Sequence, residues 1–141
     1  MNDPVRAGTA VPAAGHGGPA TLTLDDIRAA VGASAIWCPD PAVPVTGVVT
    51  ADLMSDVLVD ARPGYVLITG LTNVQTIRTA AIADLAAVVF ARGKAVPPEV
   101  VELAREMKVP IFTSARSLYE AAGGLYAVLQ RGAEGAAGRR A

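Results

Sequence analysis

The stretch Tyr65-Val-Leu-Ile-Thr-Gly-Leu-Thr-Asn73 decides the fold. It opens with an unbroken apolar run, where a half-buried strand would alternate apolar and polar residues. Such a run is typical of a strand that is covered on both faces in a parallel sheet. Asn73 then stands where the N-cap of a helix is expected. The stretch therefore predicts a strand over Tyr65–Thr69, a short loop and a helix.

Short apolar runs and helix-like stretches alternate on both sides of this unit. Four further strands are predicted, at Ser34–Cys38, Val45–Thr50, Ala87–Ala91 and Pro110–Thr113. Helices are predicted at Thr23–Gly32, Leu53–Ala61, Asn73–Leu85 and Pro97–Met107, with a last one from Leu118 through Ala122 or, beyond Gly123-Gly124, to Leu129. The first of these opens with a capping-box pattern at Thr23 and Asp26 and ends at Gly32. Helices between continuously apolar strands favour an α/β fold. We expect a three-layer α/β/α sandwich with a mostly parallel sheet of about five strands.

One domain is expected, over residues 22–129. The chain has 141 residues, of which 52% are hydrophobic but only 4% aromatic, so the core must be built from Val, Leu, Ile and Ala. Residues 1–21 and 130–141 are rich in Gly and Ala without periodicity. Because such segments bury too little apolar surface to offset their ordering entropy, we expect a disordered leader and a disordered tail.

Charge and composition exclude several classes of protein. The formal net charge of −1 provides no field for a nucleic-acid backbone or an anionic membrane. A single cysteine, Cys38, and a single histidine, His16, cannot form an intrachain disulfide or a Cys/His metal site. No signal peptide or membrane-spanning run is recognisable. We expect a cytoplasmic protein without a metal or a cofactor.

The loops that follow the predicted strands carry the candidate ligand-binding residues. In open α/β sheets, ligands bind outside the carboxyl ends of the strands, where loops turn into helix N-termini. If the strands are parallel, these loops converge on one edge of the sheet. The candidate residues there are Asp52, Ser55, Thr69, Gly70, Thr72, Asn73, Arg92, Gly93, Lys94, Thr113 and Ser114.

These residues have the chemistry of an anion site. The loop from Thr69 to Asn73 provides hydroxyls, a glycine for close approach and amides at a helix start. Arg92 and Lys94 add positive charge, and Asp52 could bond a ribose or a base edge. A nucleotide or a phosphorylated metabolite would fit. Helix capping and turn formation alone explain the same threonine, asparagine and glycine residues equally well.

No catalytic constellation is recognisable, so no catalytic residue is predicted. Arg92-Gly93-Lys94 lacks the first glycine and the following hydroxyl of a phosphate loop, and no Gly-x-Gly-x-x-Gly fingerprint occurs. The predicted domain contains no histidine that could act as a general base. Cys38 ends a predicted strand and precedes Pro39, which favours a buried structural thiol over a reactive one.

The sequence resembles small stand-alone DRTGG-domain proteins. The resemblance covers residues 44–125, and its most specific part is Ile68-Thr-Gly-Leu-Thr-Asn-Val-Gln-Thr-Ile-Arg-Thr79. Where many members have Gly-Asp-Arg, this chain reads Gly70-Leu-Thr72, and where they have Thr-Gly-Gly it reads Arg92-Gly-Lys94. The family is similar in fold to the N-terminal domain of HPr kinase/phosphorylase and, more distantly, to the uridine-nucleotide-binding domain of Mur ligases.

The resemblance implies a regulatory or dimerising role, since relatives are often fused to CBS domains. The leading hypothesis is a non-catalytic ligand-sensing domain. The alternative is an interaction module without a small ligand, which docks a protein partner or a second copy as a homodimer. The docking surface would be the region from Leu118 to Tyr126 and the exposed side of the sheet. A phosphotransferase comes third.

Overall fold

The computed structural model describes residues 10–12 and 22–140, with side chains from residue 22 to 131. Within this part, one sheet has six strands in the order β1-β3-β4-β5-β6-β2. The strands are β1 (Ala10–Pro12), β2 (Ala33–Trp37), β3 (Gly47–Thr50), β4 (Tyr65–Thr69), β5 (Ala87–Phe90) and β6 (Ile111–Ser114). Strands β3 to β6 pair in parallel, whereas β1 and β2 run antiparallel to their neighbours at the two edges.

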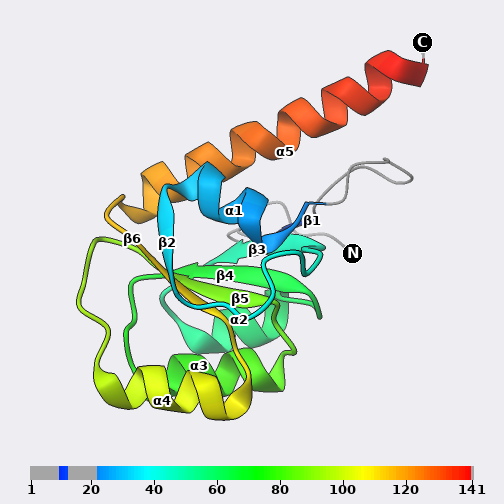
Figure 1. The fold of residues 1–141 in the computed structure, drawn as a ribbon. Coiled ribbons are helices and arrows are strands. Elements are labelled where there is room, and N and C mark those ends of the chain that lie inside the picture. The colour runs from blue at the N-terminus through cyan, green and yellow to red at the C-terminus, as the bar shows by residue number, and fades with distance from the viewer. Residues whose placement is uncertain (1–9, 13–21, 141) are drawn as a thin grey trace.

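Five helices cover the sheet on two sides (Figure 1). They are α1 (Leu24–Val31), α2 (Met54–Asp60), α3 (Val74–Ile82), α4 (Pro98–Met107) and α5 (Leu118–Arg140). Helices α1 and α5 pack together on one side, and α2, α3 and α4 lie on the other (Figure 1). The predicted α/β class and mostly parallel sheet are confirmed.

Local sequence signals set the ends of these helices. Thr23 caps α1 by accepting a bond from the Asp26 amide, and the Asp26 carboxylate accepts one from the Thr23 amide, which is a complete capping box. Gly32 ends the same helix in the left-handed region, at φ 63°. Pro98 opens α4, where the missing amide proton costs nothing. Local residues thus determine where these helices begin and end.

The strands divide the core into two apolar layers. Val66 and Ile68 of β4 pack with residues of α1 and α5, whereas Leu67 packs on the other side with residues of α3 and α4. All five residues of β4 are buried, because successive side chains point to opposite faces and both faces are covered. This double coverage is why the strand reads as a continuous apolar run.

The structure differs from the sequence prediction mainly at the ends of the chain. Strand β1 lies inside the segment predicted as a leader, and α5 continues through the predicted tail to Arg140. Residues 1–9, 13–21 and 141 lie outside the described part. β1 adds a sixth strand to the predicted sheet of about five, because it pairs with the otherwise open edge of β3.

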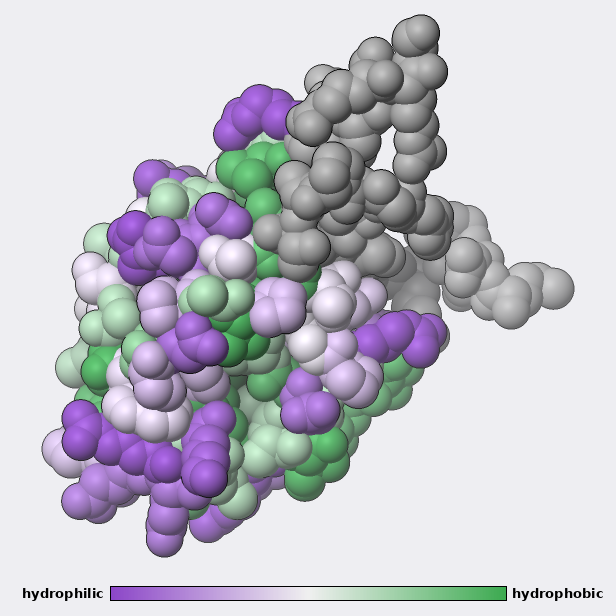
Figure 2. Space-filling model, turned by 45° about the vertical axis from the view of Figure 1, so that its right-hand side comes forward, coloured by the Kyte–Doolittle hydropathy of each residue, from purple (hydrophilic) through white to green (hydrophobic). Residues whose placement is uncertain are grey.

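Some apolar side chains remain at the surface. Figure 2 shows hydrophobic residues reaching the drawn face in several separate places, with hydrophilic residues between them. The large exposed hydrophobic residues are Leu53, Leu58, Val59, Ile82, Met107, Tyr119 and Tyr126.

Replacement of Ile68 by alanine tests the double coverage of β4. Ile68 is fully buried, so the substitution should lower the free energy of unfolding by about 2–5 kcal/mol. Urea denaturation measures it. The matched control is Ile82→Ala, since Ile82 is 74% exposed and its truncation should change stability by no more than about 0.5 kcal/mol. Equal effects at the two positions would contradict the assignment of β4 as the buried centre.

Candidate functional site

The candidate site lies at the edge where the four parallel strands end. The chain leaves β3, β4, β5 and β6 at this edge, and backbone bonds hold the outgoing loops together. The Ala91 amide donates to the Thr69 carbonyl at 2.9 Å. The next two amides, of Arg92 and Gly93, donate to the carbonyls of Arg116 and Ser114 at 2.7 and 2.8 Å. The loops after β4, β5 and β6 are therefore fixed side by side.

Asp52 is the centre of this edge. Its Oδ1 atom accepts a bond from the Gly70 amide at 2.8 Å and another from the Thr69 hydroxyl at 3.1 Å. Its Oδ2 atom accepts from Arg92 Nη2 at 3.1 Å. One carboxylate after β3 thus binds the loop after β4 and the loop after β5.

Lys94 completes the cluster. Its Nζ atom donates to the Gly70 carbonyl at 3.0 Å, so the loop after β5 reaches the loop after β4 a second time. We name Asp52, Thr69, Gly70, Arg92 and Lys94 the strand-end cluster. The Asp52–Arg92 pair is accessible, because the two side chains are 41% and 46% exposed.

Gly70 makes room for Arg92. The backbone of Gly70 is not among those with positive φ, so a special turn dihedral does not explain this glycine. A Cβ atom added at Gly70 would lie 3.2 Å from Cζ of Arg92 and 3.3 Å from its Nη1. The guanidinium would have to shift by a few tenths of an ångström to admit it. The glycine thus allows Arg92 to approach closely, and it serves no special backbone conformation.

Arg92 has a backbone conformation that is uncommon for a residue with a side chain. Its φ is 69°, and the following Gly93 has φ 63°. The hydrogen bonds from the amides of Arg92 and Gly93 to the loop after β6 hold this left-handed turn in place. The turn brings the Arg92 guanidinium within hydrogen-bonding distance of Asp52.

The later part of the loop from Thr69 to Asn73 is bonded to the first turn of α3. Asn73 caps α3 by accepting from the Thr76 amide at 3.0 Å. The buried Thr76 hydroxyl lies 2.9 Å from the Leu71 carbonyl and 3.1 Å from Asn73 Oδ1. The Leu71 amide donates back to the Thr69 hydroxyl at 3.2 Å. Sequence reasoning missed Thr76, although a threonine three residues after a capping asparagine is a usual local partner.

Ser114 and Thr113 lie outside the strand-end cluster. The buried Ser114 hydroxyl donates to the Val31 carbonyl at 2.8 Å and accepts from the Arg116 amide at 3.2 Å. It ties β6 to the end of α1. Arg116 also donates from Nη1 to the Ala30 carbonyl at 3.0 Å, so its guanidinium serves the same junction. Thr113 is partly buried and pairs in register with Ser34 of β2.

Ser55 and Thr72 lie apart from the strand-end cluster. Ser55 is exposed in the first turn of α2, and Thr72 is partly buried in the loop before α3. Of the residues predicted to form a site, the structure joins the five of the cluster directly through side-chain bonds. Gly93 supports them through its backbone, and Asn73 holds the neighbouring helix start.

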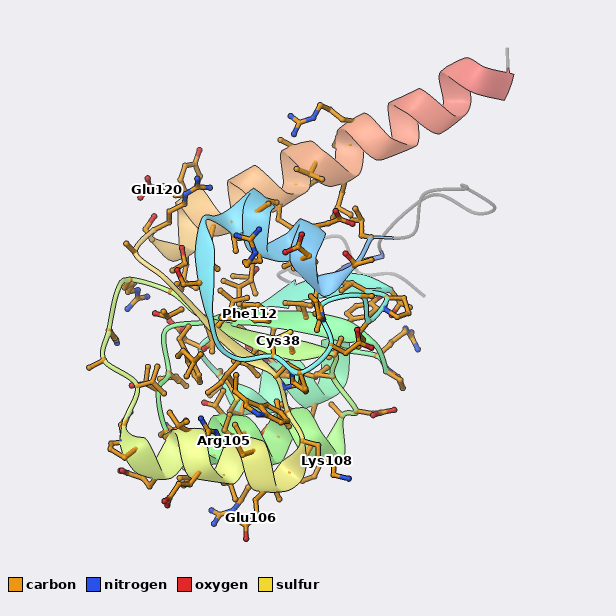
Figure 3. The ribbon with its side chains drawn as sticks, viewed as in Figure 1. Cys38, Arg105, Glu106, Lys108, Phe112 and Glu120 are labelled. Carbon is orange, nitrogen blue, oxygen red and sulfur yellow. The ribbon has the colours of Figure 1, made fainter. Side chains whose placement is uncertain are left out.

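Other chemistry is scarce in the described part. Cys38 lies just past β2 (Figure 3), and burial raises the pKa of its thiol, which reduces the thiolate fraction near neutral pH. Among the described residues, no group of three or more His, Cys, Asp or Glu is placed to hold a metal ion. In the same part of the chain, no helix combines the length and apolar character needed to cross a membrane.

Comparison with known proteins identifies the fold. No protein-family model matches the chain, and no curated sequence matches it. The structure is similar to that of the CBS and DRTGG domains of the regulatory region of Clostridium perfringens pyrophosphatase, complexed with its activator diadenosine tetraphosphate. The TM-score is 0.59 at 19% sequence identity, over 70% of this chain and 44% of that one. This chain therefore spans less than half the length of the structure it matches.

Proposed function

We propose that this protein is a non-catalytic, ligand-sensing regulatory domain of the DRTGG type. The ligand is a nucleotide or a phosphorylated metabolite, and it binds at the strand-end cluster. The observation that carries the proposal is the convergence of Arg92 and Lys94 on the loop at Gly70, across the carboxyl ends of two adjacent parallel strands. This is the edge of an α/β sheet where ligands are usually bound.

The charge and exposure of the cluster support an anionic ligand. Two cationic side chains and one carboxylate give the cluster a formal excess of positive charge. Arg92 is nearly half exposed, so its guanidinium can reach a ligand in solvent without leaving the cluster. A planar guanidinium suits phosphate oxygens, and a lysine ammonium adds a mobile point charge.

The similar structure supports a regulatory role. That protein region is regulatory and was crystallised with a nucleotide activator. Function does not follow from fold alone, so the cluster itself carries the proposal for this chain. A role without catalysis agrees with the engagement of Asp52, the one carboxylate of the cluster. Its oxygens accept bonds from Thr69, Gly70 and Arg92, and these bonds join three loops.

A thermal-shift experiment with ADP, GDP, UDP and inorganic pyrophosphate at millimolar concentration tests the proposal. At least one compound should raise the melting temperature, since a ligand that binds the folded state stabilises it. The double substitution Arg92→Gln/Lys94→Gln should remove the rise, because it removes both cations of the cluster.

The matched control is Arg105→Gln/Lys108→Gln, which makes the same change of charge on α4. Both control residues are exposed, and α4 lies on one face of the sheet, with these two residues at its C-terminal end (Figure 3). The control variant should keep the full rise in melting temperature. A rise that survives the cluster substitution, or no rise with any compound, would refute ligand binding at this edge.

A second candidate function rests on helix α5. Tyr119 and Tyr126 lie two turns apart on this helix and are 87% and 53% exposed. Between them, Gly123 faces open space, because an added Cβ would meet no atom within 4 Å. Large exposed aromatic side chains are enriched at protein interfaces. We propose as the alternative that this face of α5 joins a second copy of the chain.

Light scattering after size exclusion tests the alternative. If α5 is the interface, the protein should elute as a dimer at high concentration, and Tyr119→Ser/Tyr126→Ser should elute as a monomer. Ile82→Ser/Met107→Ser is the control, since it removes two other exposed apolar side chains. A wild-type protein that stays monomeric, or a dimer that both variants keep, would rule out this interface.

A further inference from the structure

The carboxylate of Asp52 has the surroundings that an external anion would need. A backbone amide and a hydroxyl, from Gly70 and Thr69, donate to one of its oxygens. The guanidinium of Arg92 donates to the other. Amides, hydroxyls and guanidinium groups in such a combination are the donor set with which proteins bind phosphates and carboxylates. In this structure the side chain of Asp52 accepts the bonds that these donors could give to an external anion.

We propose that Asp52 is a specificity-determining residue that competes with the ligand. It occupies the anion position of the strand-end cluster, and an anionic group binds there by displacing it. This competition rests on the proposed function, and it adds how that site selects its ligand. A carboxylate ligand would only replace one singly charged group by another, with no gain in charge at the site. A phosphate or pyrophosphate group brings more negative charge to the same donors.

The placement of Asp52 allows the displacement. Its side chain is 41% exposed, so the carboxylate can turn into solvent, where it is well hydrated. It lies in the irregular segment between β3 and α2, outside both elements. The N-cap of α2 is Leu53, whose side chain makes no capping bond, so rotation of Asp52 breaks no helix cap.

The remaining contacts stay in place when Asp52 leaves. Gly93 and Arg92 are held by backbone bonds to the loop after β6, the Thr69 carbonyl accepts from the Ala91 amide, and Asn73 caps α3 independently of Asp52. The backbone segments that carry the three donors therefore keep their places around the position that the carboxylate vacates. Lys94 lies on the same loop, bonded to the Gly70 carbonyl, and can turn toward the newcomer.

Calorimetric titration with inorganic pyrophosphate tests the proposal, because this probe presents charge without a base or a sugar. Asp52→Ala frees the donors permanently, so its dissociation constant should be at least about tenfold lower than that of the wild type. Asp56→Ala is the matched control, since it removes an exposed carboxylate of the neighbouring helix, outside the strand-end cluster. Its affinity should stay within about twofold of the wild type.

A second variant keeps the test decisive if Asp52→Ala fails to fold. Asp52→Asn retains an oxygen that can accept from the Gly70 amide but loses the charge that holds Arg92. It should bind pyrophosphate more tightly than the wild type, by a smaller factor than the alanine variant. Far-ultraviolet circular dichroism establishes that each variant is folded.

The outcomes separate this proposal from the proposed function. If both Asp52 variants bind pyrophosphate as weakly as the wild type or more weakly, Asp52 does not compete with the ligand. If nucleotides still stabilise the wild type in that case, the proposed ligand sensing stands and Asp52 is an ordinary contact of the site. If Asp52→Ala binds pyrophosphate tightly but no nucleotide stabilises the wild type, the result supports competition by Asp52 and refutes ligand sensing by the native chain. No pyrophosphate binding by any variant overturns the competitor.

Discussion

The carboxylate of Asp52 is the interaction that joins the loops at the edge of this domain. It joins the end of β3 to the loops after β4 and β5 through a backbone amide, a hydroxyl and a guanidinium. Three loops that begin on separate strands thus become one surface. The guanidinium of Arg92 lies against Gly70, and Arg92 has a left-handed backbone that directs its side chain there. The apolar sheet fixes the strand ends, backbone bonds hold the loops after β4, β5 and β6 beside one another, and this charged contact joins their donor groups.

The sequence predicts the elements well where local signals and burial agree. The bounds of β4 are predicted to the residue, and the capping box at Thr23 and the glycine end at Gly32 are found as expected. The convergence of strand-end loops is a consequence of parallel pairing alone. Strand β1 could not be predicted, because three residues carry no periodicity and depend on an open edge of β3 for their pairing. The full length of α5 could not be predicted either, because Gly123 and Gly124 interrupt the helical pattern of the sequence.

Single-residue roles in the candidate site are harder to predict than its location. Sequence reasoning places Ser114 and Thr69 in equivalent loops, yet the hydroxyl of Ser114 is buried against α1 and that of Thr69 bonds Asp52. The pairing of Asp52 with Arg92 joins residues far apart in the chain, so no local pattern reveals it. The similar pyrophosphatase region shares the fold at 19% identity.

The most direct test of a ligand site at the strand-end cluster is a nuclear magnetic resonance titration of the ¹⁵N-labelled wild-type protein with ADP. If the nucleotide binds there, the amide signals of Gly70, Arg92 and Gly93 should shift together and saturate with one dissociation constant. The amide of Lys108, which precedes β6 at the opposite end of the strands, should stay unchanged. Shifts confined to α5 around Tyr119, or none at any concentration, would contradict binding at this edge of the sheet.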